Sequence, residues 1–353
     1  MKAAALALAV LISALSGCQT DLGYLVKQGG WLYHYSRGTR NIDSLLESPS
    51  TPEDTRGFLL TVKDIRRFAV EKVGLRDNGN YTRYRSIDRD HLVDVVQACD
   101  AVSFAPYQWS YPLLGRLPYK GFYERADAEA EASRLKKAGY DVIVRGVDAF
   151  STLGFFHDPL YSFMKKYPPF ELASTIIHEQ THATLFVRGQ PEFNEELATF
   201  VGDTGAFQWL EERYGTGSEE YRDALDQRAD FDLFVAELKG LSAELKKVYD
   251  QALPREETLA EKARIIAAFK GTFRRDAGRF RTPEYRAARD LPLNNAYLSL
   301  YDLYTEDIPL LRSYEEKRCG GDLRSFMLAA ERLSKKGDIK EQMRAELAAG
   351  DSH

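Results

Sequence analysis

The spacing of His178, Glu179 and His182 is the feature of this sequence that most directly predicts chemistry. The segment reads His-Glu-Gln-Thr-His (HExxH), so the two histidines lie four residues apart. On an α-helix this spacing places both imidazoles on one face, where they can bind the same metal ion. Neutral imidazole suits Zn²⁺, so we expect one zinc ion here. Glu179 lies beside that ion, where it can take a proton from a water that the metal activates.

The residues around this motif predict a buried helix from about position 169 to 187. The chain has only six histidines, so a chance pair with a glutamate between them is rare. Unpaired polar groups in a buried helix cost several kcal/mol, which favours a functional motif over a surface helix with coincidental histidines. The apolar flanks are Phe170, Leu172, Ala173, Ile176, Ile177, Ala183, Leu185 and Phe186.

A third metal ligand is expected at the start of the next predicted helix, which spans 194–214. A catalytic zinc has three protein ligands and leaves its fourth position to water. The loop at 188–191 contains glycine and proline, and twelve residues separate His182 from Glu195, which lets the chain turn back. Glu195 is therefore the predicted third ligand. Glu196 remains an alternative, although it points roughly 100° away around the helix.

The N-terminus has the features of a bacterial lipoprotein signal peptide, which we predict to span residues 1–17. The apolar run 3–15 follows a lysine and is too short to cross a bilayer comfortably. It ends in Leu-Ser-Gly before Cys18, which resembles a lipobox. Cleavage before Cys18 and acylation of that residue would anchor the chain to a membrane. A plain secretory signal and an apolar N-terminal helix of a cytosolic protein are the alternatives.

Position 19 and the other cysteines bear on the compartment. Gln19 rather than aspartate follows Cys18, which favours a bacterial cell envelope location at the outer membrane, facing the periplasm. Cys99 and Cys319 are then the remaining thiols. In an oxidising compartment they could form one disulfide, but two free thiols fit the sequence equally well, so no bridge is predicted.

Composition predicts a globular protein without a nucleic-acid partner. Of the 353 residues, 44% are hydrophobic and 29% are charged, and the formal net charge is −5. These values are ordinary for a globular protein. No block of basic residues stands apart from compensating aspartate and glutamate, so no surface for DNA or RNA is expected.

The pattern of elements predicts an α+β fold, in which a small sheet packs on the HExxH helix and the C-terminal half is mainly helical. No repeat or linker divides the chain, so we interpret residues 18–353 as one domain. The other elements predicted from periodicity and turn residues are a helix at 59–73, strands at 81–87 and 98–109, a helix at 127–138, a strand at 140–147, and two helices at 219–252 and 255–274.

The chain resembles a family of bacterial lipoproteins described as predicted aminopeptidases, over nearly its whole length. The segment at Glu195 also resembles the Asn-Glu-x-x-Ala signature of the gluzincin metallopeptidases, in which the glutamate after asparagine binds the metal. The metzincin pattern is excluded, because Leu185 and Arg188 stand where it needs glycine and histidine. Beyond the HExxH motif and the lipobox, the resemblance rests on Pro118-Tyr-Lys-Gly-Phe-Tyr123, Val147-Asp-Ala-Phe-Ser-Thr-Leu-Gly154, His157-Asp-Pro159 and Asn294-Asn-Ala296.

This resemblance implies a zincin-like fold and a zinc peptidase that acts from the free N-terminus of peptides. Gluzincins often supply a donor for the oxyanion from a later helix. Tyr297, Tyr301 and Tyr304 could act in this way, and Tyr304 is preferred.

Two further parts of an aminopeptidase site stay open. A carboxylate is needed for the α-amine of the substrate, and the sequence does not choose among Asp148, Asp158 and Glu196. In related enzymes an edge strand before the HExxH helix pairs with the substrate backbone. Residues 142–152, with Phe150 lining the cleft, are the candidate, and an ordinary core strand is the alternative.

Two other functions fit the same sequence. A zinc endopeptidase would use the same centre on internal bonds. A non-catalytic envelope lipoprotein would instead hold a structural metal, which a closed site with a fourth protein ligand would indicate.

Overall fold

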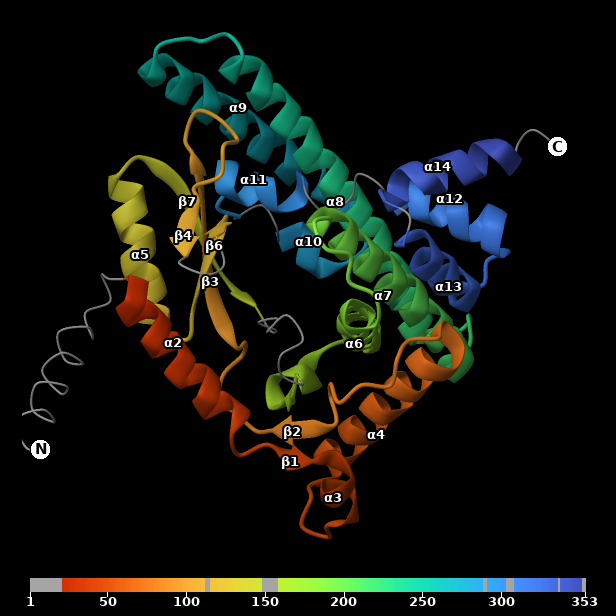
Figure 1. Cartoon of the computed structure of the whole chain (residues 1–353). Coiled ribbons are helices and arrows are strands. Elements are labelled where there is room, and N and C mark those ends of the chain that lie inside the picture. The colour runs from red at the N-terminus through yellow and green to blue at the C-terminus, as the bar shows by residue number, and fades with distance from the viewer. Residues whose placement is uncertain are drawn as a thin grey trace, which may run out of the picture.

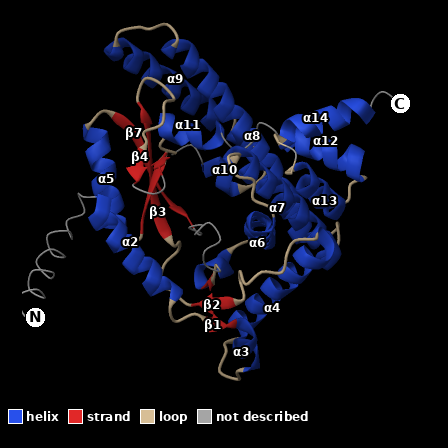
Figure 2. Ribbon diagram, in the orientation of Figure 1, coloured by secondary structure: helices blue, strands red, loops and turns tan. Residues whose placement is uncertain are grey.

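The computed structural model describes residues 21–111, 115–147, 158–287, 291–302, 308–335 and 337–350. They form the predicted α+β fold, with small sheets beside a larger helical body (Figures 1 and 2). The helical elements are α2 (Asp21–Ser36), α3 (Ile42–Glu47), α4 (Glu53–Phe68), η1 (Ala69–Val73), α5 (Arg125–Lys137), η2 (Ser162–Lys166), α6 (Pro169–Thr184), α7 (Pro191–Tyr214), α8 (Glu219–Tyr249), α9 (Arg255–Arg275), η3 (Ala277–Arg279), α10 (Pro283–Ala287), α11 (Asn295–Asp302), α12 (Ile308–Cys319), α13 (Leu323–Leu333) and α14 (Ile339–Gly350). The strands are β1 (Arg40–Asn41), β2 (Arg83–Arg85), β3 (Val93–Asp100), β4 (Trp109–Tyr111), β5 (Gly115–Leu117), β6 (Tyr119–Phe122), β7 (Tyr140–Val147) and β8 (Leu160–Tyr161).

Elements with strong local signals have close to their predicted bounds. The strand predicted at 140–147 is β7, and the helices predicted on either side of Leu253-Pro254 are α8 and α9. Every described element after β8 is helical, which confirms the mainly helical C-terminal half. β-branched residues and a proline break act through neighbours in the chain, so the sequence alone specifies these elements.

The strand predicted at 98–109 is wrong. β3 ends at Asp100, the chain turns, and β4 begins only at Trp109. The Asp100 side chain accepts a hydrogen bond from the Val102 N–H at 2.7 Å, and the Tyr107 N–H returns to the Ala98 carbonyl at 2.9 Å. An uninterrupted apolar run carries no periodic signal that marks such a turn.

The main sheet has the strand order β6-β3-β7, and both strand pairs are antiparallel. The side chains of β3 alternate between two faces, as the pleat requires. Val96 and Ala98 pack toward α5, whereas Val95 joins the core that contains α6, and Cys99 packs on Ala296 of α11. The sheet thus lies between α5 and α11, and it meets the HExxH helix through a shared core rather than lying directly on it (Figure 1).

A second sheet, β1-β2-β8, fixes the chain that leads into the HExxH helix. β2 and β8 run parallel, with Tyr84 opposite Leu160 and Arg85 opposite Tyr161. Leu160 is fully buried in the same core as α6. The short pair therefore holds the segment just before α6 against a distant part of the chain.

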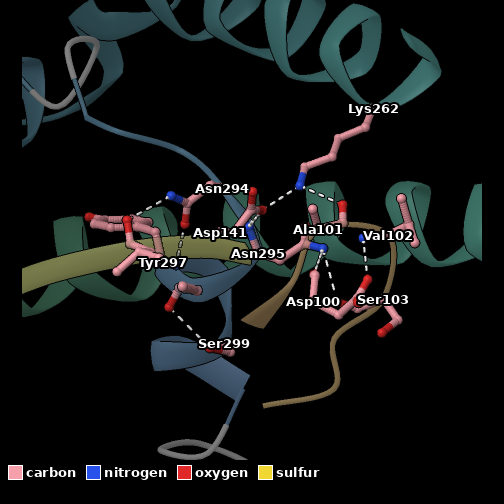
Figure 3. Close-up of polar contacts among 12 residues, drawn as sticks. Asp100, Ala101, Val102, Ser103, Asp141, Lys262, Asn294, Asn295, Tyr297 and Ser299 are labelled. Atoms are coloured by element: carbon pink, nitrogen blue, oxygen red, sulfur yellow. Dashed lines mark hydrogen bonds and ion pairs between the residues drawn. The ribbon is translucent and has the colours of Figure 1, made fainter. Parts of the chain in front are cut away.

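The Asn294-Asn295 motif fastens α11 to the end of the main sheet (Figure 3). Asn294 accepts a hydrogen bond from the Tyr297 N–H at 2.9 Å, which caps the helix, and donates to the Val142 carbonyl of β7 at 3.2 Å. The buried Asn295 side chain donates to the carbonyls of Asp100 and Ser103 at 2.9 and 3.0 Å.

An ion pair closes the same cluster. Asp141 of β7 accepts a hydrogen bond from the Asn295 N–H at 2.7 Å and also pairs with Lys262 of α9. Lys262 is 6% exposed and donates to the Ala101 carbonyl at 2.8 Å. Figure 3 shows these side chains pointing toward one another from the strands, α9 and α11. Because its charges and donors have partners, the cluster is structural.

Replacing Asn295 by leucine should lower the free energy of unfolding by about 3 kcal/mol, because two carbonyls and the Tyr249 hydroxyl lose their partner and each unmet buried group costs about 1–3 kcal/mol. Urea unfolding followed by circular dichroism measures this. Gln251→Leu, at an exposed amide just after α8, is the control. Equal unfolding midpoints for the two variants would contradict a structural role.

Candidate metal centre

Helix α6 carries both histidines of the predicted site. Pro169 stands in its first turn, where the missing N–H costs no hydrogen bond, and the helix ends after Thr184. The Nε2 atoms of His178 and His182 are 3.1 Å apart, so both imidazoles point into one region. Ile177, directly before His178 in the chain, is fully buried, which fixes the rotation of the helix.

Asn194 sets the position of α7 relative to the end of α6. Its side-chain oxygen accepts a hydrogen bond from the Val187 N–H at 2.8 Å, and its amide donates to the Val187 carbonyl at 2.9 Å. Asn194 is 2% exposed, so this pair of bonds is shielded from water. The loop between the helices is thereby closed immediately before Glu195.

Two glycines let α6 and α7 approach closely beside the histidines. A Cβ at Gly202 would lie 2.9 Å from the Ser174 carbonyl oxygen and 3.2 Å from the Cβ of His178. A Cβ at Gly205 would lie 3.1 Å from the Ile177 side chain. Gly202 is two helical turns from Glu195, on the same face, so the close approach brings Glu195 to the histidines.

The three predicted ligands have the spacing that a tetrahedral zinc ion requires. Glu195 Oε2 lies 3.7 Å from His178 Nε2, and Glu195 Oε1 lies 3.6 Å from His182 Nε2. Bonds of about 2.0–2.1 Å at tetrahedral angles place neighbouring ligand atoms about 3.4 Å apart. The three donors therefore outline one face of such a tetrahedron, and a His-His-Glu set suits zinc chemically.

The three predicted ligands are partly accessible to solvent. The side chains of His178 and His182 are 22% and 18% exposed, and that of Glu195 is 49% exposed. Among the described residues, no fourth His, Cys, Asp or Glu joins the group. Three protein ligands with an accessible fourth position are typical of catalytic rather than structural zinc.

Burial and the charges of neighbouring residues shift the pKa values of His178 and Glu195 in the direction that favours cation binding. Burial, and next the charge of His182, lower the pKa of His178 to about 4, so its imidazole is neutral at physiological pH and can bind a metal. Burial alone would raise the pKa of Glu195, but the hydrogen bond and charge of His182 and the charge of His178 outweigh it and lower that pKa. The third ligand is therefore an anion.

Glu179 is the partly buried acid of the site. Burial raises its pKa to about 7; the charge of His182 opposes this rise, and the carboxylates of Asp158 and Glu195 add to it. Glu179 is not part of the group that outlines the metal position. A carboxyl group with this pKa beside the site is suited to exchanging protons near neutral pH.

Glu196 points away from the metal position. It is 3% exposed, and its Oε2 lies 2.6 Å from the Nζ of Lys340 on α14. The alternative ligand left open by the sequence is thus occupied in a buried ion pair.

Other predicted parts of the site are placed elsewhere or lie outside the described residues. The hydroxyls of Tyr297 and Tyr301 are 3.2 Å apart, and both rings pack in the core built on α8. β7 is an edge strand of its sheet, as the substrate-pairing hypothesis needs. Five residues that the sequence analysis singled out lie outside the described ranges, namely Cys18, Asp148, Phe150, His157 and Tyr304.

Sequence reasoning missed a polar network that joins the three helices around the site. Ser174, one turn before His178, donates to Asp203 Oδ1 of α7 at 2.8 Å. Asp203 also pairs with Arg228 of α8. These residues carry no motif, and only their meeting across three helices reveals them.

The two cysteines within the described residues, Cys99 and Cys319, are free thiols. Cys99 is fully buried, and burial raises the pKa of its thiol to about 11. Cys319 is half-buried at the end of α12.

Within the described ranges, no helix is both long enough and apolar enough to cross a membrane.

Residues 23–346 match the family model described as "Putative aminopeptidase". No curated protein and no solved structure matches the chain.

Proposed function

We propose that this chain, which belongs to the "Putative aminopeptidase" family, is a zinc-dependent peptidase that removes residues from the free N-terminus of peptides. The observation that carries the proposal is the spacing of His178, His182 and Glu195, at 3.1–3.7 Å, with Glu179 beside them. A zincin-like arrangement, with two ligands from one helix and the third from the next, is part of this proposal.

Each residue of the site has a proposed role. A zinc ion held by His178, His182 and Glu195 would polarise the scissile carbonyl and lower the pKa of the attacking water. Glu179 takes the proton of that water and returns it to the leaving amine. Tyr304 stays the predicted donor to the oxyanion, and the outer edge of β7 the predicted partner of the substrate backbone.

We also propose that the protein works at a membrane surface. The lipobox predicts removal of residues 1–17 and lipidation of Cys18, and α2 begins three residues later, at Asp21. The N-terminal end of α2 would then lie within about 11 Å of the anchor, since extended chain spans about 3.3–3.6 Å per residue. An outer-membrane protein facing the periplasm would act on peptides of the cell envelope.

The test uses the purified full-length protein in detergent, assayed for bound zinc and for cleavage of peptides with free and acetylated N-termini. We expect about one zinc per chain, and cleavage of the free peptides that is lost with a chelator and restored by Zn²⁺. Equal cleavage of acetylated peptides would indicate the endopeptidase instead. Bound zinc without any hydrolysis would indicate a structural metal.

A further inference from the structure

Helix α2 is fastened to the rest of the protein along one face. Tyr24 is 7% exposed, donates to the Gly121 carbonyl at 2.7 Å and packs edge-on against Phe122. Two turns later, the Trp31 N–H donates to Glu124 at 3.1 Å. These contacts fix the rotation of the helix. Its other face is therefore held outward, at the edge of the molecule (Figure 1).

The outward face of α2 is apolar over most of its length. Val26 and Tyr33 are 63% and 60% exposed, and Leu25 is 36% exposed. These are three of the ten large hydrophobic residues that are exposed within the described part of the chain, so such residues are concentrated on this one helix. Gly29 and Gly30 lie between them, and a Cβ at either glycine would meet nothing within 4 Å. We call these five residues the outer face of α2.

Four arginines gather where α2 ends, and we call them the arginine cluster. Arg37 and Arg40 follow the helix, and Arg83 and Arg85 come from β2, which pairs with the strand that begins at Arg40. Arg85 donates to the Arg37 carbonyl. Arg83 donates to the Thr39 carbonyl at 2.8 Å. Within the described residues, none of the four pairs with an aspartate or a glutamate, so their charges are not neutralised by the protein.

This combination of groups fits the surface of an anionic bilayer. Apolar side chains of a helix in the membrane interface enter the boundary between headgroups and acyl chains, and tyrosine is enriched at the headgroup level. Arginine forms paired hydrogen bonds with phosphate. The two parts are also adjacent on one side of the helix, because Arg37 stands four residues after Tyr33.

The position of the predicted anchor decides how α2 would lie on such a surface. Cys18 precedes the N-terminal end of α2 by three residues, and the arginine cluster stands at the other end. The helix has 16 residues and is therefore about 24 Å long. The arginines can reach the phosphates of the same leaflet only if the helix lies along the membrane.

We propose that the outer face of α2 and the arginine cluster dock on an anionic bilayer, with α2 parallel to the membrane surface. This inference rests on the proposed lipidation of Cys18 and adds an orientation that a flexible anchor alone does not impose. The anchor keeps the surface close to the bilayer, so docking is intramolecular and a weak interaction is sufficient. Each arginine beside an anionic surface favours docking by about fivefold.

The test places the fluorophore NBD on the outer face of α2 in the full-length, lipidated protein. Val26→Cys carries the label, and Leu328→Cys on α13 is the control, because Leu328 is 64% exposed. Both variants also carry Cys319→Ala, and Cys99 is fully buried, so the label attaches at one position. Quenching by doxyl-labelled lipid is measured in vesicles of phosphatidylethanolamine and phosphatidylglycerol. We expect strong quenching at position 26 and none at position 328.

The arginine cluster is tested in the labelled protein by combining Arg37→Gln with Arg40→Gln. Losing two arginines should lower the ratio of docked to undocked protein by roughly 25-fold. Replacing phosphatidylglycerol by phosphatidylcholine should lower it as well. The control combines Arg274→Gln with Arg275→Gln, two exposed arginines in the last turn of α9, and should leave the ratio unchanged. Equal ratios for the two pairs would overturn the role of the arginine cluster.

Further measurements separate this inference from the proposals on which it rests. Mass spectrometry of Cys18 tests the anchor, and a protein without acyl chains that is still quenched at position 26 overturns the anchor alone. Absent quenching at position 26 in anionic vesicles overturns the docking of α2, whether or not Cys18 is acylated. An NBD signal that changes without vesicles as the protein concentration rises would assign the outer face to a second copy of the chain instead. No bond is cleaved in these measurements, so a failure of the peptidase proposal appears only in the hydrolysis assay.

Discussion

Glu179→Gln should keep its zinc and lose peptide hydrolysis by about 10²–10⁴-fold, the usual contribution of a general acid–base group. Glutamine has nearly the same shape but cannot accept a proton from water or return one to the leaving amine. The Glu179 carboxylate lies outside the His178–His182–Glu195 group, so metal affinity should not depend on it. Zinc content by mass spectrometry and kcat for a free-amine peptide are the two measurements.

The control for this prediction lies on the same helix. Glu171 stands exposed in the first turn of α6, and Glu171→Gln changes the same functional group away from the site. We expect wild-type zinc content and wild-type kcat for it. A Glu179→Gln enzyme that turns over as fast as Glu171→Gln would rule out the proton-transfer role, and one that loses zinc would make Glu179 a ligand.

Adjacent glutamates in α7 should give opposite results when each is replaced by alanine. Glu195→Ala removes a direct metal ligand, so zinc affinity should fall by more than about 100-fold, since even residues that only support a ligand are worth 10–100-fold. Its side chain is half-exposed, so the free energy of unfolding of the metal-free protein should change little. Competition with a chromophoric chelator measures the affinity.

Glu196→Ala should instead destabilise the fold and leave the metal site intact. Lys340 would lose its buried counter-ion, and breaking such a pair costs about 3–5 kcal/mol. Urea unfolding of the metal-free protein should show this loss, while the folded fraction binds zinc as the wild type does. If Glu196→Ala lost zinc and Glu195→Ala did not, the two assignments would have to be exchanged.

The candidate site was predictable to the extent that helical spacing determines it. His178 and His182 are four residues apart, so any helix places their imidazoles together. The turn at 188–191 and the position of Glu195 on the returning helix are also local features. The sequence therefore predicted that the three ligands lie together. In the structure their ligand atoms lie within 4.8 Å of one another.

What the sequence could not provide is the set of groups that hold these ligands in place. Gly202 matters because it lies against Ser174 and His178 of the neighbouring helix. Glu196, which the sequence offered as a ligand or an amine-binding group, is paired with Lys340 of a helix near the C-terminus. The sequence pattern around each of these residues is unremarkable.

The sequence by itself determined the α+β class, the bounds of elements such as β7 and α9, and the three-ligand pattern, because hydrophobic periodicity, turn residues and i,i+4 spacing act over a few neighbouring residues. Only the tertiary structure decided where β3 ends, which way Glu196 faces, and that Ser174 and Arg228 meet at Asp203. Those outcomes depend on contacts between segments far apart in the chain, and no local pattern records them.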